Sequence, residues 1–304
     1  MLKTSTIKTL FKRTVPYVWG YDHMCALIKS IFSKAAFNWI SRLPVKPGLI
    51  IKAKFGSNSI FLSKPERCSI AKKFFWTDGQ ILPKEDEMAI NYFIALSQQS
   101  KYILDIGSNS GIFSLIASRS NPNAKVFSYD ILPEAFHLLI DNLMINNLMD
   151  SVTPFLNGVG KSGVYHAPMN NITSEMPTSL KLDQSYKDHN SIEVEVKTLD
   201  NIFSELHINE QACIKIDVEG FEADIFENSK LVLEIHRPFF LCEVLTTTLD
   251  YFKYNTLLSN YHYKKFLITD MGLIAYEDIS PNIRFKDWIF IPKEKLDNVF
   301  DDVT

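Results

Sequence analysis

The stretch Tyr102-Ile-Leu-Asp-Ile-Gly107-Ser-Asn-Ser-Gly111 predicts a buried strand, a tight turn and the start of a helix. An apolar run is closed by glycine, and Ile112, Leu115 and Ile116 then follow at helical spacing. Strands and helices alternate after this stretch, which implies a parallel sheet with right-handed crossovers in a doubly wound α/β fold. The expected helices are 85–98, 133–147, 200–206 and 220–235, and the expected strands are 125–129, 152–156, 212–218, 239–244, 261–269 and 288–291.

Two regions depart from this alternation. Residues 1–80 are expected to be an N-terminal extension of the domain at 81–304, with a basic amphipathic helix at 26–42 and strand-like material at 49–62. Residues 158–196 are rich in Asn, Ser, Thr and Pro and end in an alternating run. We expect them to form a loop-rich insertion with a β-ribbon.

Charge and cysteine usage restrict the class of protein. The chain carries a net charge of −3, and residues 1–54 hold ten Lys/Arg and one acid, so +9 there leaves −12 for residues 55–304. No global basic surface for nucleic acid is expected. The four cysteines are scattered without a CxxC pair, which is typical of free thiols in a reducing cytoplasm. We expect neither a secretion signal nor a membrane span, hence a cytoplasmic protein.

The glycine spacing of the first turn indicates which cofactor it holds. A dinucleotide site uses G-x-G-x-x-G, whereas three residues including Asn109 separate Gly107 from Gly111. The spacing disfavours a nicotinamide cofactor and favours the amino-acid and ribose portions of S-adenosylmethionine, although a mere tight connection stays an alternative. The predicted cofactor-binding residues are Asp105, Gly107, Ser108, Asn109, Gly111, Asp130 and Asn157.

Asp130 ends the second strand, 25 residues after Asp105. An acid at this position can accept both ribose hydroxyl groups of a nucleoside, as in dinucleotide folds. The alternative is an acid stabilised by the N-terminus of the helix that starts at Pro133. Together with the glycine turn, the ribose role is the preferred interpretation.

The run Ile214-Lys-Ile-Asp-Val-Glu-Gly220 supplies the candidate catalytic residues Lys215, Asp217 and Glu219. Their two-residue period predicts one common side of a strand that ends at the carboxyl edge of the sheet, where ligands bind. A buried lysine requires a carboxylate partner, for which Asp217 and Glu243 are the candidates; an ion pair that only orders two strands is the alternative.

A mechanism follows from these residue types. Asp217 is predicted to act as a base or to orient the group that accepts the methyl group of S-adenosylmethionine. Lys215 is predicted to position Asp217, and Glu219 to contact the cofactor or the substrate. We predict no metal site. Mg²⁺ held by Asp217 and Glu219 is the weaker alternative, because a hard cation needs few carboxylates besides water.

Several motifs in this order resemble the FkbM family of methyltransferases over residues 84–292: Asp105–Gly111, Tyr129-Asp-Ile-Leu-Pro-Glu134, Thr198-Leu-Asp200, Ile214–Gly220, and Pro238 leading to Glu243. The resemblance implies a class I, mostly parallel seven-stranded sheet, S-adenosylmethionine as donor, and O-methylation of a sugar, polysaccharide or natural-product hydroxyl. The chain departs from the family in three ways: Asp130 stands where Glu is usual, a common glycine is replaced near Asn228, and no His follows Glu243.

Three other functions fit the sequence less well. An NAD(P)-dependent oxidoreductase conflicts with the glycine spacing, and an inactive cofactor-binding scaffold conflicts with the intact Lys215, Asp217 and Glu219. Nucleic-acid base methyltransferases usually carry an Asn/Asp-Pro-Pro motif, which this chain lacks. The acidic catalytic portion also disfavours binding to nucleic acid. The expected partner is a small-molecule or glycan acceptor, and residues 26–42 are expected to pack within the chain, form a homodimer or contact a membrane peripherally.

Overall fold

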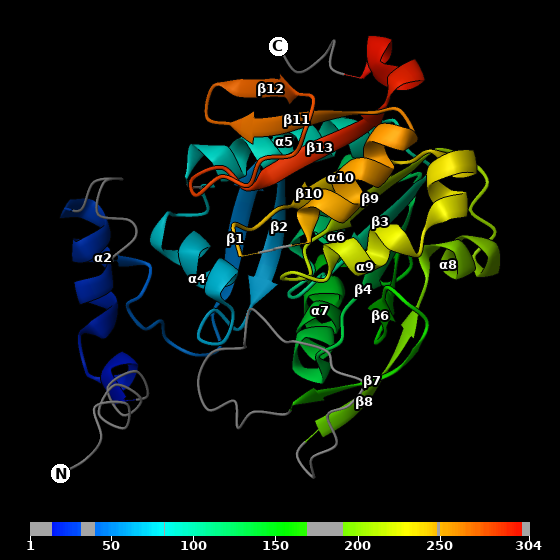
Figure 1. Cartoon of the computed structure of the whole chain (residues 1–304). Coiled ribbons are helices and arrows are strands. Elements are labelled where there is room, and N and C mark those ends of the chain that lie inside the picture. The colour runs from blue at the N-terminus through cyan, green and yellow to red at the C-terminus, as the bar shows by residue number, and fades with distance from the viewer. Residues whose placement is uncertain (1–13, 32–39, 82, 169–190, 248–249, 300–304) are drawn as a thin grey trace, which may run out of the picture. The chain divides into compact units, whose positions relative to one another are not determined.

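A computed structural model describes residues 14–31, 40–81, 83–168, 191–247 and 250–299 (Figure 1). These residues form two compact units, the first within 14–81 and the second within 83–299. Among the described residues, the first unit contains a two-stranded sheet, and the second contains an eight-stranded and a three-stranded sheet.

The first unit is small and contains an apolar cluster of buried side chains. Its α2 helix starts five residues before the predicted helix at 26–42, of which residues 32–39 lie outside the described part of the chain. The strand-like material forms an antiparallel hairpin. Tyr21, Cys25, Ile40, Val45 and Trp76 make up the buried cluster. The elements are η1 (Val15–Tyr17), α2 (Tyr21–Ile31), β1 (Ile50–Phe55), β2 (Asn58–Ser63) and α4 (Ser69–Trp76).

The second unit is built on an eight-stranded sheet with the order β12-β11-β13-β10-β9-β3-β4-β5. The five strands from β10 to β5 run parallel, while β13, β11 and β12 pair antiparallel. This confirms the mostly parallel class I sheet, with β12 as an additional edge strand. The bounds are β3 (Tyr102–Ile106), β4 (Lys125–Tyr129), β5 (Val152–Phe155), β9 (Ala212–Ile216), β10 (Phe239–Glu243), β11 (Tyr263–Thr269), β12 (Gly272–Tyr276) and β13 (Asp287–Pro292).

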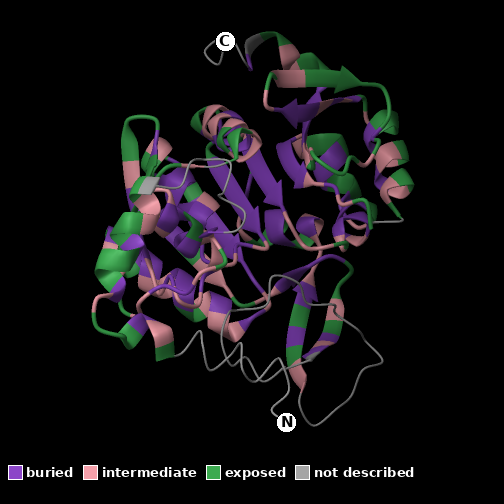
Figure 2. Ribbon diagram, turned by 90° about the vertical axis from the view of Figure 1, so that its left-hand side faces the viewer, coloured by how far each residue is buried: buried purple, intermediate pink, exposed green. Residues whose placement is uncertain are grey.

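Helices cover both faces of this sheet (Figure 1). One apolar cluster joins alternate strand residues such as Leu104, Ile214 and Phe240 to α8, α9 and α10, and the opposite face carries α5, α6 and α7. The central strands are therefore buried on both sides (Figure 2). The helices are α5 (Lys84–Gln98), α6 (Ile112–Ser120), α7 (Pro133–Asn146), α8 (Leu199–Glu205), α9 (Glu222–Glu227) and α10 (Tyr251–Asn260).

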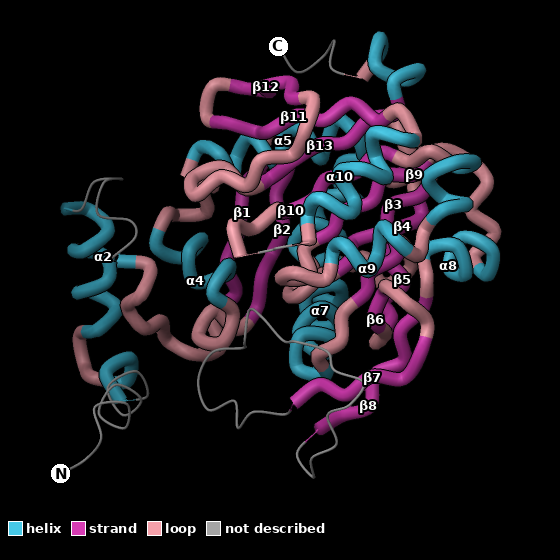
Figure 3. The backbone as a smooth tube through the Cα atoms, in the orientation of Figure 1, coloured by secondary structure: helices cyan, strands magenta, loops and turns pink. Residues whose placement is uncertain are grey.

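The insertion forms a separate three-stranded sheet with the order β6-β8-β7 (Figure 3). β7 (Gly163–Pro168) and β8 (Ser191–Lys197) pair antiparallel and make the ribbon that the alternating residues indicate, while β6 (Gly158–Val159) joins β8 in parallel. Residues 169–190 of the predicted insertion lie outside the described part.

The single helix predicted at 220–235 is wrong. α9 ends at Glu227, and a π-helical turn, η3 (Val232–His236), follows. The helix stops because Asn228 donates its side-chain amide to the carbonyl of Asp224 and Ser229 donates its hydroxyl to that of Phe226, which satisfies carbonyls at the helix end. Of the described helices, none combines the length and apolar character that crossing a membrane requires.

Candidate functional site

The turn after β3 is shaped by its two glycines. The amides of Gly107 and Ser108 both donate to the carbonyl of Tyr129 on β4, at 2.9 and 3.0 Å. Gly107 has a φ of 77°, and a Cβ there would lie 1.9 Å from the carbonyl oxygen of Asp217. Gly111 has a φ of 78°, and its Cβ would meet the side chain of Leu139 at 2.2 Å. Both positions therefore require glycine for backbone conformation and for close packing.

Asp105 supports this turn from inside the sheet. Its carboxylate is fully buried and accepts hydrogen bonds from the amide and the hydroxyl of Ser114, at 3.0 and 2.7 Å. Burial raises the pKa of Asp105, and nearby Lys215 opposes that rise. Because the carboxylate faces the start of α6, its effect on a ligand would pass through the turn; its cofactor role stays a prediction.

Asp130 faces the glycine turn from the end of β4. One carboxylate oxygen accepts the amide of Asn109 at 2.7 Å and the other accepts the amide of Leu132 at 2.9 Å. Only 8% of Asp130 is exposed, and burial is the main cause of its raised pKa. The acid thus lies at the turn, as the ribose interpretation requires, while its second oxygen also holds the start of α7, as the alternative interpretation expects.

Two hydroxyls of the turn have no hydrogen-bond partner among the described residues, those of Ser108 and Ser110. Both side chains are buried, so each offers a donor and an acceptor that a bound ligand would satisfy. Ser108 belongs to the predicted set, whereas Ser110 does not. Asn157 donates its side-chain amide to Glu195 of β8, with 3.0 Å to the carboxylate, and its predicted cofactor role remains untested.

Lys215 is buried between two strands and has two acidic partners. Its ammonium group lies 3.1 Å from the carboxylate of Asp217 and 3.8 Å from that of Asp105, which is its register partner on β3. It also lies 4.9 Å from the centre of the Phe113 ring. Asp217 is confirmed as a partner. Glu243, the other candidate, lies 3.9 Å from Lys286 instead.

Asp217 and Glu219 lie beyond the strand that was expected to carry them. β9 ends at Ile216, and Glu219 has a left-handed φ of 55°, so a common strand face is the wrong explanation for their proximity. The loop nevertheless brings their carboxylates together with that of Glu243, all within 4.8 Å of one another. Such a group of oxygens could hold a hard cation such as Mg²⁺.

Burial and neighbouring negative charge raise the pKa values of three acids at this site. The pKa of Glu243 rises to about 8, first through burial and then through the negative charges of Asp217 and Asp287. The pKa of Asp287 rises to about 7 through burial and the charges of Asp86 and Asp217. Burial also raises the pKa of Glu219. Glu243 and Asp287 can therefore exchange protons near neutral pH.

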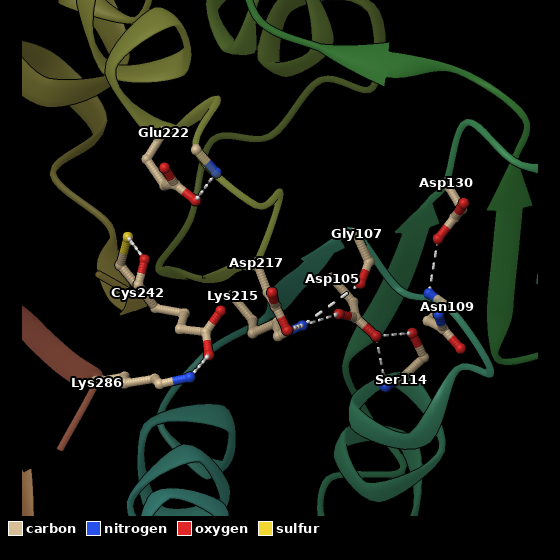
Figure 4. Close-up of polar contacts among 12 residues, drawn as sticks. Asp105, Gly107, Asn109, Ser114, Asp130, Lys215, Asp217, Glu222, Cys242 and Lys286 are labelled. Carbon is tan, nitrogen blue, oxygen red and sulfur yellow. Dashed lines mark hydrogen bonds and ion pairs between the residues drawn. The ribbon is translucent and has the colours of Figure 1, made fainter. Parts of the chain in front are cut away.

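The turn and the acidic cluster lie at the same edge of the sheet, because β3, β4, β9 and β10 are parallel and end there. Figure 4 shows Asp105, Lys215 and Asp217 directed toward one another, with Asp130 next to Asn109 on the far side of the turn. The arrangement can hold a polar ligand at the turn and accept a proton beside it.

Comparison with known proteins identifies the family of this chain. The model of the methyltransferase FkbM domain matches residues 105–265. The chain is similar to the methyltransferase sdnD of Sordaria araneosa, with 24% identity over 177 residues that cover 49% of this chain and 68% of that protein. Methyltransferase 1 of Beauveria bassiana is 21% identical over 150 residues, which cover 44% of this chain and 60% of that protein.

Two solved structures show weaker likeness. A methyltransferase FkbM from Methylobacillus flagellatus KT gives a TM-score of 0.41 at 16% identity, covering 63% of this chain and 44% of its own. An O-methyltransferase from Bacillus cereus in complex with SAH gives a TM-score of 0.40 at 9% identity, covering 69% of this chain and 80% of its own. The chain thus spans less than half of the M. flagellatus protein.

Proposed function

Because this chain belongs to the FkbM family of methyltransferases, with S-adenosylmethionine as the methyl donor, we propose that its acceptor is a hydroxyl group of a sugar, a polysaccharide or another natural product. The observation that carries the proposal is the common sheet edge, where Asp130 bonds to the glycine turn and the cluster of Asp217, Glu219 and Glu243 lies beside it.

The turn offers groups suited to the donor. The unsatisfied hydroxyls of Ser108 and Ser110 can bond to polar atoms of its amino-acid and ribose portions, and Asp130 can accept from a ribose hydroxyl with the remaining lone pairs of its carboxylate. When bound, the donor supplies an activated methyl group on a sulfonium. The residues of the chain then have to align the acceptor oxygen with that methyl group and exclude water.

Proton removal is assigned to the carboxylate cluster. Asp217 would accept the proton that the acceptor hydroxyl gives up on methylation, and Lys215 fixes Asp217 by an ion pair at 3.1 Å. Glu243 and Glu219 lie close enough to take up that proton afterwards. This step needs no metal ion, so incubation with a chelator should leave turnover unchanged. A loss of turnover that Mg²⁺ restores would instead indicate that the carboxylate cluster binds a metal ion.

Calorimetric titration tests the donor. S-adenosylmethionine should bind and NAD(P) should not, and Asp130→Ala should weaken binding relative to Asp150→Ala, whose acid is exposed. Binding of NAD(P) without S-adenosylmethionine would contradict the assignment. A screen of glycans and hydroxylated natural products with labelled donor then identifies the acceptor.

Asp217→Asn tests the base. Turnover should fall about 10²- to 10⁴-fold while donor affinity stays near that of the wild type. Glu193→Gln on β8 is the matched control, because its exposed acid lies in the insertion, and it should keep full turnover. Normal turnover in the Asp217 variant would exclude it as the proton acceptor.

A further inference from the structure

The first unit exposes an unusual concentration of large apolar side chains. Five of the 18 exposed large hydrophobic residues of the described chain fall between positions 17 and 27. Trp19 is 98% exposed. We call this set the N-terminal apolar surface, and it comprises Tyr17, Val18, Trp19, Met24 and Leu27.

The α2 helix is anchored independently of these residues. Tyr21 and Cys25 are buried in the cluster of the first unit with Ile28 packed against it, and the Tyr21 hydroxyl donates to the carbonyl of Pro44 at 2.6 Å. Met24 and Leu27 are three residues apart and so form a second apolar stripe outside that buried face. The helix therefore holds its place with one side and presents apolar atoms on another.

Charge indicates what this surface meets. Residues 1–81 contain 14 Lys/Arg and three acids, a net charge of +11. A second copy of this unit would carry the same charge and be repelled, whereas an anionic lipid surface attracts the basic residues near it. Trp19 and Tyr17 are also of the residue types that are enriched where a protein meets a membrane interface.

We propose that the N-terminal apolar surface inserts into the interface of an anionic lipid bilayer and holds the enzyme on it. The contact is peripheral: Trp19 and Leu27 enter the headgroup region while basic residues of the first unit pair with lipid phosphates and carboxylates. The proposal does not depend on the methyl acceptor, since lipid binding is measured without donor or acceptor.

Co-sedimentation of the full chain with vesicles tests it. Binding to phosphatidylcholine vesicles that contain phosphatidylserine should exceed binding to phosphatidylcholine alone by roughly tenfold or more, and should weaken with salt. Trp19→Ser/Leu27→Ser should reduce binding roughly tenfold or more. The matched control is Met271→Ser/Ile283→Ser, which removes two exposed apolar side chains from the second unit and should bind like the wild type.

Tryptophan emission separates the occupants of this surface. Vesicles should shift the fluorescence emission of the wild type to the blue, because Trp19 enters the headgroup region. Trp19→Phe should abolish that shift, although the other three tryptophans remain in the chain. Absence of vesicle binding, or equal binding by the double variant and its control, overturns the proposal. The proposal is also overturned if the wild type is a dimer and the double variant is a monomer. A melting temperature of the double variant below that of the wild type overturns it too, because these side chains would then pack within the chain.

Discussion

At Gly107, one backbone conformation decides how closely the loops after β3 and β9 approach each other. Gly107→Ala should cost about 1–2 kcal/mol for the left-handed conformation and about 1–3 kcal/mol more because the added Cβ meets the Asp217 carbonyl. Gly220→Ala is the matched control: its φ is 106° and no atom lies within 4 Å of the added carbon. Denaturant unfolding should show a larger loss for Gly107; equal losses would mean that the loops are not in contact.

Lys215 compensates two buried or half-buried carboxylates. Lys215→Met should destabilise the fold by about 3–5 kcal/mol, because Asp105 and Asp217 lose their shared cation inside the protein. The Lys286 side chain is 46% exposed and its ammonium group lies 3.9 Å from Glu243, so the effect of Lys286→Met should stay within about 1 kcal/mol. Similar unfolding free energies for the two variants would argue against a buried ion pair at Lys215.

The raised pKa of Glu243 gives a pH dependence with a definite sign. A carboxyl whose pKa rises from 4.5 to about 8 on folding keeps its proton longer in the folded state. Stability should therefore fall as the pH rises through this range and level off above it. Glu243→Gln should flatten this slope and be more stable than the wild type above about 8, whereas exposed Glu210→Gln should leave the slope unchanged. Urea unfolding across the range measures both slopes.

At the scale of elements, Asp200 of α8 caps the start of η3, a helical segment that is distant in sequence. Its carboxylate accepts the amides of Leu231 and Val232 at 3.2 and 2.9 Å, the bonds that a helix N-cap normally provides. Asp200→Ala should cost about 0.5–2 kcal/mol in unfolding free energy. Exposed Glu234→Ala in the same segment should change it by less than about 0.5 kcal/mol. Equal effects would show that the cap does not support η3.

The sequence predicts the central strands well, because each is an apolar run bounded by Gly, Pro or polar residues. It does not predict that η3 starts as a separate segment after α9, since the amides at that start are held by Asp200, 31 residues before Leu231. It also misses α10 and β12; the edge strand β12 is largely exposed and has no clear alternation of buried residues. Apolar runs in the sequence indicate strands that are buried on both faces, and they are less informative for strands at the edge of a sheet.

The candidate site shows the same division. The glycine turn and Asp130 follow from motif and spacing, and the structure brings them together through Asn109. The Lys215–Asp105 contact depends on β9 lying next to β3, a strand order that a single sequence does not contain. The proximity of Glu219 to Asp217 and Glu243 arises from a left-handed loop residue rather than from strand period.

For the whole molecule, the distribution of charge predicts how donor and product are distinguished. Residues 82–304 carry −14, because the chain totals −3 and residues 1–81 contribute +11. The sheet edge concentrates this charge: it combines the acids Asp105, Asp130, Asp217, Glu219, Glu243 and Asp287 with the two bases Lys215 and Lys286. The sulfonium of S-adenosylmethionine is positive and is lost when the methyl group leaves, so the product is less attracted to this edge.

We therefore expect S-adenosylmethionine to bind about tenfold more tightly than S-adenosylhomocysteine at low salt, with the ratio falling as salt screens the acids. Glu219→Gln should reduce the ratio, and Glu193→Gln in the insertion should not. Because Glu243 gains full negative charge only above its pKa of about 8, the ratio should also grow as the pH passes that value. Calorimetry at two salt concentrations measures it. A ratio independent of salt and pH would mean that shape, rather than the charge of this edge, separates donor from product.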